Sequence, residues 1–186
     1  MSSFQAVVIG ASAGALEALS AILPYLPASF PVPILIVVHI PPDRPSALAD
    51  LFAAKCRMAV KEAEDKEPLL AGTIYFAPPD YHLLVEVDKT VALSSDEQVF
   101  FSRPSIDVLF ETAADAYQER LIGIVLSGAN SDGANGLKTI MAAGGVGLVQ
   151  NPDTAFAAAM PEAAEKMNPD ADAMTLAEIA ECLKKV

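Results

Sequence analysis

Residues 6–14 read Ala-Val-Val-Ile-Gly-Ala-Ser-Ala-Gly, and this stretch decides the fold. Its first four residues form a continuous apolar run, which predicts a buried β-strand. The next five match the pattern Gly-x-Ser-x-Gly, and a helical pattern of apolar residues begins at Ala15. A serine in a tight turn between a strand and a helix, flanked by small residues, holds its hydroxyl clear of the sheet. The first hypothesis from this segment is therefore a serine hydrolase.

Strand-like and helical patterns alternate over the rest of the chain. Continuous apolar runs at 34–39, 121–126 and 146–150 predict further parallel strands that are covered on both faces. Apolar residues share one helical face at Leu16, Leu19, Ile22 and Leu23, at Ile106, Leu109, Phe110, Ala113 and Tyr117, and at Leu137, Ile140 and Met141. A capping box at 175–178 predicts the start of a last helix. We expect an α/β fold in three layers, with a doubly wound, mostly parallel sheet.

The middle of the chain has a different pattern. Residues 73–77, 82–87 and 90–94 are strand-like, and Asp88-Lys89 joins the last two. A two-residue connection between strand-like runs predicts a β-hairpin, so we expect an antiparallel excursion here. Neither an internal repeat nor a linker interrupts the sequence, and we expect residues 1–186 to form one catalytic domain.

The charge of the chain narrows the range of partners. Twelve Lys and Arg residues stand against 24 Asp and Glu residues, for a formal net charge of −12. Such a balance argues against nucleic acid, which is bound largely through basic side chains, and against docking on anionic lipid. The sequence has no apolar run long enough to span a bilayer, and residues 1–3 lead into the first strand without a signal peptide. We therefore expect a cytoplasmic protein.

Few residues are available for a cofactor or metal. Cys56 and Cys182 have no metal-ligand spacing and are expected to be reduced, structural thiols. The glycines of 10–14 could cradle a phosphate, but the Gly-x-Gly-x-x-Gly spacing is missing. No ligand spacing supports a metal site built from His39 and His82. We expect neither a cofactor nor a metal, and a nucleotide-binding domain is the weaker alternative.

Three chemically useful residues follow predicted strands. Ser12 follows the first strand, His39 ends the second, and Asp132 lies in the loop after 121–126. The carboxyl ends of parallel strands meet at one edge of a sheet, so His39 could act as base for Ser12, with Asp132 fixing the imidazole tautomer. The order Ser, His, Asp differs from that of α/β-hydrolases. Two structural alternatives remain open: His39 could be a hydrogen-bonded structural residue, and Asp132 could cap the helix that begins near Gly133.

Several motifs in the same order give the chain a family resemblance. It resembles the catalytic domain of the chemotaxis protein-glutamate methylesterase family over nearly its whole length. The resemblance rests on residues 8–14, 38–41, 60–65, 72–82, 103–110, 126–128, 132–133, 150–151 and 160–161.

The resemblance implies a reaction and a substrate. The family's serine, histidine and aspartate fall on Ser12, His39 and Asp132. The family hydrolyses the γ-methyl esters of glutamates on the cytoplasmic helices of methyl-accepting chemoreceptors, without a cofactor, and some members deamidate receptor glutamines. Ser12 would then attack the ester carbonyl and expel methanol, and water would cleave the acyl-enzyme. A catalytically weak receptor-binding adaptor on the same fold is the alternative function.

Five further positions are candidates for the pocket. Backbone N–H groups at Ala13 and near Ala129 would stabilise the oxyanion, with Gly14 in the same turn. His82 and Arg103 lie on matched motifs, so His82 could border the cleft and Arg103 could hold a carboxylate. Their structural alternatives are a histidine on the hairpin surface and an ordinary surface arginine.

The chain also departs from the pattern that it resembles. The family commonly has threonine after the nucleophile and then paired glycines, where this chain has Ala13 and Gly14-Ala15. Its loop often reads Gly-Met-Gly-Asn-Asp, where residues 128–132 read Gly-Ala-Asn-Ser-Asp. Such substitutions leave the backbone N–H donors unchanged, but they alter the side chains that shape the pocket. Most relatives carry an N-terminal receiver domain. Either this chain lacks that domain or the domain has been removed from it. A naturally free-standing chain would act without phosphorylation, and a separate receiver or kinase could be a further partner.

Overall fold

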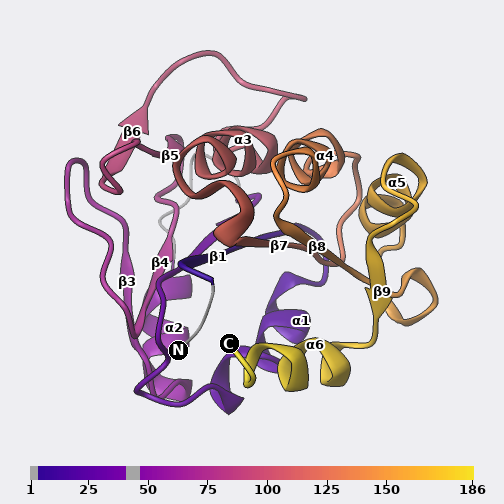
Figure 1. Cartoon of the computed structure of the whole chain (residues 1–186), viewed down its shortest axis with the longest axis horizontal. Coiled ribbons are helices and arrows are strands. Elements are labelled where there is room, and N and C mark those ends of the chain that lie inside the picture. Colours follow the sequence, from indigo (N-terminus) through magenta and orange to yellow (C-terminus); the bar gives the residue numbers. More distant parts are fainter. Residues whose placement is uncertain (1–3, 41–46) are drawn as a thin grey trace.

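A seven-stranded parallel sheet forms the centre of the computed structural model, which describes residues 4–40 and 47–186 (Figure 1). The order across the sheet is β3-β4-β2-β1-β7-β8-β9. The strands are β1 (Ala6–Ala11), β2 (Ile34–Val38), β3 (Ala59–Glu62), β4 (Thr73–Phe76), β7 (Leu121–Val125), β8 (Val146–Gln150) and β9 (Asp172–Met174). The N-terminal residues 1–3, where no signal peptide is expected, and the end of the 38–41 motif lie outside the described residues.

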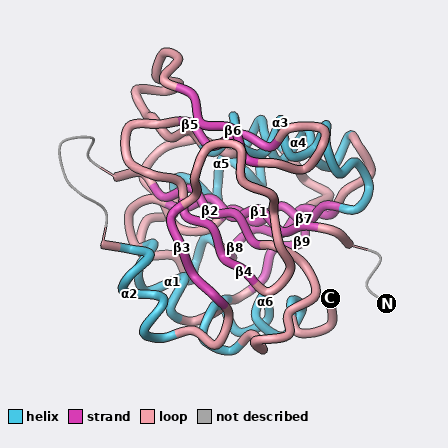
Figure 2. Tube along the Cα trace, turned by 90° about the vertical axis from the view of Figure 1, so that its left-hand side faces the viewer, coloured by secondary structure: helices cyan, strands magenta, loops and turns pink. Residues whose placement is uncertain are grey.

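Helices cover both faces of this sheet (Figures 1 and 2). One layer contains α3 (Ile106–Tyr117), α4 (Ala134–Ala142) and α5 (Ala159–Met167), and the other contains α1 (Ala15–Ser20), α2 (Leu48–Lys55) and α6 (Leu176–Leu183). Short 3-10 turns lie at Leu23–Tyr25, Gln118–Arg120 and Pro152–Thr154. The predicted three-layer, doubly wound α/β fold is confirmed. Within 4–40 and 47–186, no helix has the length and apolar character needed to cross a membrane.

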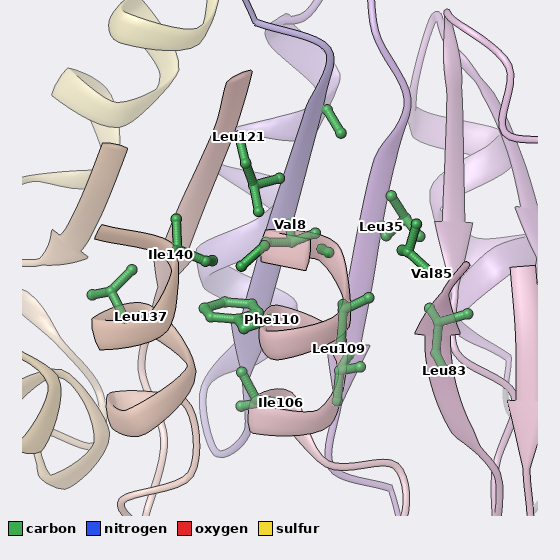
Figure 3. Close-up of a cluster of buried hydrophobic side chains, with 14 of the residues drawn as sticks. Val8, Leu35, Leu83, Val85, Ile106, Leu109, Phe110, Leu121, Leu137 and Ile140 are labelled. Atoms are coloured by element: carbon green, nitrogen blue, oxygen red, sulfur yellow. The ribbon is translucent and has the colours of Figure 1, made fainter. Parts of the chain in front are cut away.

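The continuous apolar strands are explained by two separate cores. Along β1, Val8 faces the layer of α3 and α4, where it packs in a cluster with Leu35 and Phe110 (Figure 3). Val7 and Ile9 belong to the cluster on the opposite face. Successive residues of a strand point to opposite faces, so a strand covered on both sides needs an apolar residue at every position. All six residues of β1 are accordingly buried.

The predicted hairpin is also confirmed, as a separate two-stranded antiparallel sheet of β5 (His82–Val85) and β6 (Val91–Ser94). The Val85 N–H donates to Thr112 Oγ1 at 3.1 Å, which ties the hairpin to α3. The strand at 73–77, grouped with the hairpin in the sequence, instead pairs parallel with β2 and β3. Its buried run Ile-Tyr-Phe is typical of a covered parallel strand. Strands β3 and β9 were not predicted because both are short and mostly exposed edge strands.

The carboxyl edge of the sheet brings distant segments together. The last pair in the register of β1 and β2 is Ala11 with Val38, and the His39 N–H donates to the Ala11 carbonyl oxygen at 3.2 Å. Ser12 and His39 are therefore the next residues on neighbouring strands. Gly10 allows α3 to approach this edge, because a Cβ at that position would lie 2.3 Å from the Ile106 side chain.

Candidate functional site

The turn that carries Ser12 is held by Ser127, a buried residue that follows β7. The Ser12 N–H donates to the Ser127 carbonyl oxygen at 2.9 Å. The Ser127 hydroxyl donates to the Ala13 carbonyl oxygen at 2.6 Å and accepts from the Ala157 N–H at 2.9 Å. Gly14 has a φ of +83°, and a Cβ there would lie 2.7 Å from the Phe156 Cβ. The turn thus requires glycine at that position and fixes the backbone on both sides of the Ser12 hydroxyl.

His39 is oriented by two polar side chains from the loop after β7. Its Nε2 lies 2.8 Å from Asp132 Oδ2, and its Nδ1 lies 3.4 Å from Asn130 Nδ2. The Asn130 Oδ1 accepts from the Asp132 N–H at 3.0 Å, so the Asn130 amide group faces the ring. A carboxylate can only accept, so a neutral His39 carries its proton on Nε2 and a lone pair on Nδ1. Nδ1 is therefore the nitrogen that can act as a base.

Asp132 is fully buried at the N-terminus of α3. Its Oδ2 accepts from the Ile106 N–H at 2.7 Å, and its Oδ1 accepts from the Asp107 N–H at 2.9 Å and the Ser105 hydroxyl at 3.1 Å. Burial alone would raise its pKa, but the hydrogen bonds from His39 and from the N–H groups of Asp107 and Ile106 outweigh burial and lower the pKa below 3.8. Asp132 is thus an anion at neutral pH, held by the positive end of a helix.

The structure brings His39 and Asp132 into direct contact and puts Ser12 beside His39. Within residues 4–40 and 47–186 the Ser12 hydroxyl has no hydrogen-bond partner, so it is free to rotate toward His39 Nδ1. The predicted pocket positions Ala13, Gly14 and Ala129 lie in the two loops that flank Ser12 and His39. In the same described residues, no group accepts a hydrogen bond from the N–H of Ala13 or Ala129. Both N–H groups remain available as donors.

A small cavity of about 290 Å³ opens at the His39 ring. Its lining residues come from the end of β2 and from the segment between β6 and α3: His39, Ile40, Gln98, Phe101, Ser102, Arg103 and Pro104. The cavity has room for one extended side chain. Across the part of the chain that the structure describes, no group of three acidic, histidine or cysteine side chains is placed to hold a metal ion.

Arg103 and His82 both contact the segment that precedes α3. The Arg103 guanidinium lines the cavity, but it binds Asp80 Oδ1 at 2.7 Å and the carbonyl oxygens of Ser95 and Asp96 at 2.9 and 3.0 Å. His82 is buried, not on the hairpin surface, and does not line the cavity. Its Nδ1 accepts from the Ser105 N–H at 3.1 Å, and its Nε2 lies 2.8 Å from the Glu97 carbonyl oxygen. Contact of these side chains with a substrate stays a prediction.

Sequence reasoning missed a second buried carboxyl group. Asp107, in the first turn of α3, accepts through one oxygen from the N–H groups of Gly133 and Gly136 at 2.9 and 2.7 Å. Asp132, just before α4, binds the first turn of α3 in return. Asp107 thus caps α4, which follows Asp132, and Asp132 caps α3, which contains Asp107, so the two carboxyl groups together fix the position of Asp132. The motif at 103–110 contains Asp107, but it gives no sign that this carboxyl group binds Gly133, which lies 26 residues away.

Asp107 should make stability depend on pH. Burial raises its pKa from 3.8 to about 6, against the lowering effect of the Gly136 N–H. The folded chain therefore binds this proton more tightly than the unfolded chain does. The stability that its protonation provides is complete below pH 4 and is lost as pH rises to about 6. Asp107→Asn keeps an oxygen for both N–H groups but cannot titrate. Between pH 4 and 7, its free energy of unfolding in urea should therefore fall by about 2–3 kcal/mol less than that of the unaltered chain.

Asp115→Asn is the matched control, because Asp115 is an exposed carboxyl group on the same helix. It should leave the pH dependence as it is in the unaltered chain. Asp107→Ala loses both hydrogen bonds and should destabilise the chain at every pH. If Asp107→Asn has the same slope of unfolding free energy against pH as the unaltered chain, Asp107 is not the group that titrates.

Fold and site together define an α/β protein with a serine, a histidine and an aspartate at the carboxyl edge of its parallel sheet. The chain belongs to the CheB methylesterase family, whose model matches residues 7–183. The family resemblance read from the motifs is thereby confirmed. The structure is also similar to the crystal structure of the CheB methylesterase catalytic domain of Thermotoga maritima, with a TM-score of 0.92 and 32% identity over 98% of each chain.

Two curated relatives have names that specify an activity. A putative protein-glutamate methylesterase/protein-glutamine glutaminase of Leptospira interrogans (strain Fiocruz L1-130) is 49% identical over 179 residues, which are 96% of this chain and 93% of that protein. The protein-glutamate methylesterase/protein-glutamine glutaminase of Symbiobacterium thermophilum is 33% identical over 96% of this chain. The chain spans about half the length of the second relative, at 49% of it.

Proposed function

We propose that this chain is a serine hydrolase that removes the γ-methyl ester of glutamate residues in chemoreceptors and releases methanol. The observation that carries the proposal is the His39–Asp132 hydrogen bond beside Ser12, within a fold of the CheB methylesterase family. Membership of that family and the names of the relatives support an esterase acting on protein glutamate. The same attack on a glutamine side chain would release ammonia, which is the second activity in those names.

The reaction begins with transfer of the Ser12 proton to His39 Nδ1. The Ser12 oxygen attacks the ester carbonyl carbon, and Asp132 stabilises the imidazolium that forms. The tetrahedral intermediate collapses with cleavage of the bond to the methoxy group, which takes the proton from His39 and leaves as methanol. Water then gives a proton to His39 and attacks the acyl-enzyme, so that the glutamate carboxylate is released and Ser12 recovers its proton.

The oxyanion of each tetrahedral intermediate would be stabilised by backbone N–H groups. The candidates are Ala13, directly after the nucleophile, and Ala129, in the loop that also carries Asp132. Neither N–H has an acceptor within residues 4–40 and 47–186, which is what an oxyanion site requires. Because these donors belong to the backbone, the alanines at both positions keep them.

The substrate we propose is the cytoplasmic helical region of methyl-accepting chemoreceptors, and the site of action is the cytoplasm. The net charge of −12 opposes nucleic acid or anionic lipid as the partner. A separate receiver domain or kinase as a partner belongs to the same proposal. The adaptor alternative requires a disassembled triad, whereas Asp132 has all four of its hydrogen bonds.

The test is methanol release from methylated chemoreceptor fragments, before and after treatment with a serine-directed fluorophosphonate. We expect methanol release that stops in proportion to covalent labelling, with the label on Ser12 in peptide mass spectrometry. A glutamine-containing fragment measured for ammonia gives the ratio of the two activities. A folded chain that neither releases methanol nor takes up the label would favour the adaptor.

A further inference from the structure

A two-residue turn with two aromatic side chains stands at the rim of the cavity. Val99 and Ser102 exchange two backbone hydrogen bonds of 3.0 and 2.9 Å, and Phe100 and Phe101 occupy the central positions. Their φ angles are +49° and +60°. Positive φ at both central residues defines a type I′ turn, which favours asparagine and glycine there. The two phenylalanines therefore oppose the local preference of the backbone.

Packing within the fold does not account for these residues. The Phe101 side chain is 96% exposed and Phe100 is 49% exposed. Large apolar side chains gathered on a surface commonly mark a place where another molecule binds. In Figure 1 the segment between β6 and α3, which carries this turn, arches beyond α3 on the outside of the helical layer.

The base of this segment is held firmly on both sides. Arg103 binds the carbonyl oxygens of Ser95 and Asp96 and the carboxylate of Asp80. On the inner side, the His82 ring lies within hydrogen-bond distance of the Glu97 carbonyl oxygen. A tip on a fixed base loses little conformational entropy when it binds, which favours affinity. Arg103 and His82 thus hold in place the segment that carries the Phe100–Phe101 turn.

The turn adjoins the catalytic site through the cavity that His39 lines, although Ser12 and Asp132 are not among its lining residues. Phe101 and His39 line the same cavity of about 290 Å³, a volume that holds a substrate side chain but not a helical segment of a protein. Recognition of a larger substrate must therefore come from the surface around the cavity. Arg103 is the one cationic side chain among the described residues of the lining, and its guanidinium is engaged within the chain. Beside the cavity, the exposed Phe100 and Phe101 side chains offer an apolar contact.

We propose that Phe100 and Phe101 contact an apolar side chain of the protein substrate, next to the glutamate ester that enters the cavity at His39. Exposed aromatic residues with a fixed backbone are efficient anchors in protein recognition. The contact distinguishes an ester on a helical protein from the same ester on a small molecule. This inference rests on the proposed function and adds the residues that select a protein substrate.

The test compares two substrates that carry the same ester bond. One is a methylated chemoreceptor fragment, and the other is a single glutamate γ-methyl ester with an acetylated amine and an amidated carboxyl group. The double variant Phe100→Asn, Phe101→Gly installs the residues that a type I′ turn prefers. We expect kcat/KM for the receptor relative to that for the small ester to fall at least about tenfold, mainly through KM, with no loss of thermal stability.

Val87→Ser is the matched control, since Val87 is a 77% exposed apolar residue in the connection between β5 and β6. It should leave the ratio unchanged. An equal loss on both substrates, or no loss on either, would overturn the aromatic contact while leaving the esterase proposal intact. Hydrolysis of the small ester with none on methylated receptors by the unaltered chain would overturn the proposed function, and this contact with it.

Discussion

A chain with alanine in place of Ser12 should release methanol from methylated receptors at least about 10⁵-fold more slowly than the unaltered chain. The alanine removes the only oxygen from which an acyl-enzyme can form in the proposed reaction. The Ser12 backbone N–H still binds the Ser127 carbonyl oxygen, so the turn and the stability of the fold should be preserved. Single-turnover methanol release with excess enzyme, together with thermal unfolding, measures both effects.

Ser131→Ala is the matched control for this loss. Ser131 is exposed and lies next to Asp132 in the loop after β7, so it is a serine of the same site with no part in the proposed chemistry. Its replacement should keep methanol release within about threefold. A Ser12→Ala chain that retains more than a few per cent of the activity would mean that another group attacks the ester, and the role of Ser12 would have to be abandoned.

The neighbourhood of Ser12, His39 and Asp132 could be predicted because each follows an apolar strand. Parallel strands deliver such residues to one edge of the sheet, and β1, β2 and β7 are adjacent in the structure. The sequence left open that Asp132 caps the helix that begins near Gly133, but in the structure the Asp132 side chain does not cap that helix, α4. Asp132 does cap a helix, but it caps α3, which precedes it by 15 residues at its nearest end, and it also binds His39.

The supporting residues could not be predicted, because their roles depend on contacts between distant segments. Asp107 reaches the start of α4, and Ser127 reaches the turn after Ser12, 114 residues away. Neither contact leaves a periodic or spaced pattern in the sequence. Asn130 shows the same limit: it was noted only as a departure from the family loop, yet its amide group faces the His39 ring.

Burial explains the different outcomes at His82 and Arg103. A histidine in a hairpin strand can face water or the core, and the alternation of β5 does not decide this from the sequence alone. In the structure, His82 is buried against the N-terminus of α3. Arg103 borders the cavity, but its guanidinium donates hydrogen bonds to Asp80 and to two carbonyl oxygens. The sequence motifs indicated that His82 and Arg103 lie near the site, but only the hydrogen bonds show what each side chain contacts.

Asp132→Asn should lower kcat/KM for methylated receptors by about 10⁴-fold. Each Asp132 oxygen accepts from a backbone N–H, Oδ2 from Ile106 and Oδ1 from Asp107, so an asparagine amide group must face an N–H whichever way it is turned. If the amide group faces His39, the ring can no longer keep its proton on Nε2, and Nδ1 loses the lone pair that accepts the Ser12 proton. The measurement pairs receptor kinetics with ¹⁵N NMR of the His39 ring.

Ser105→Ala separates this loss of the base from a loss of stability. It removes one hydrogen bond to Asp132 Oδ1 and weakens the N-terminal cap of α3, but it leaves the bond from His39 Nε2 to Oδ2 in place. We expect it to destabilise the chain by about 1 kcal/mol and to cost less than about tenfold in kcat/KM, with the His39 tautomer unchanged. Asp132→Asn should combine a shifted tautomer with the far larger kinetic loss. Should the asparagine chain keep its proton on Nε2 and still lose activity, Asp132 would act through the position of α3 rather than through the histidine.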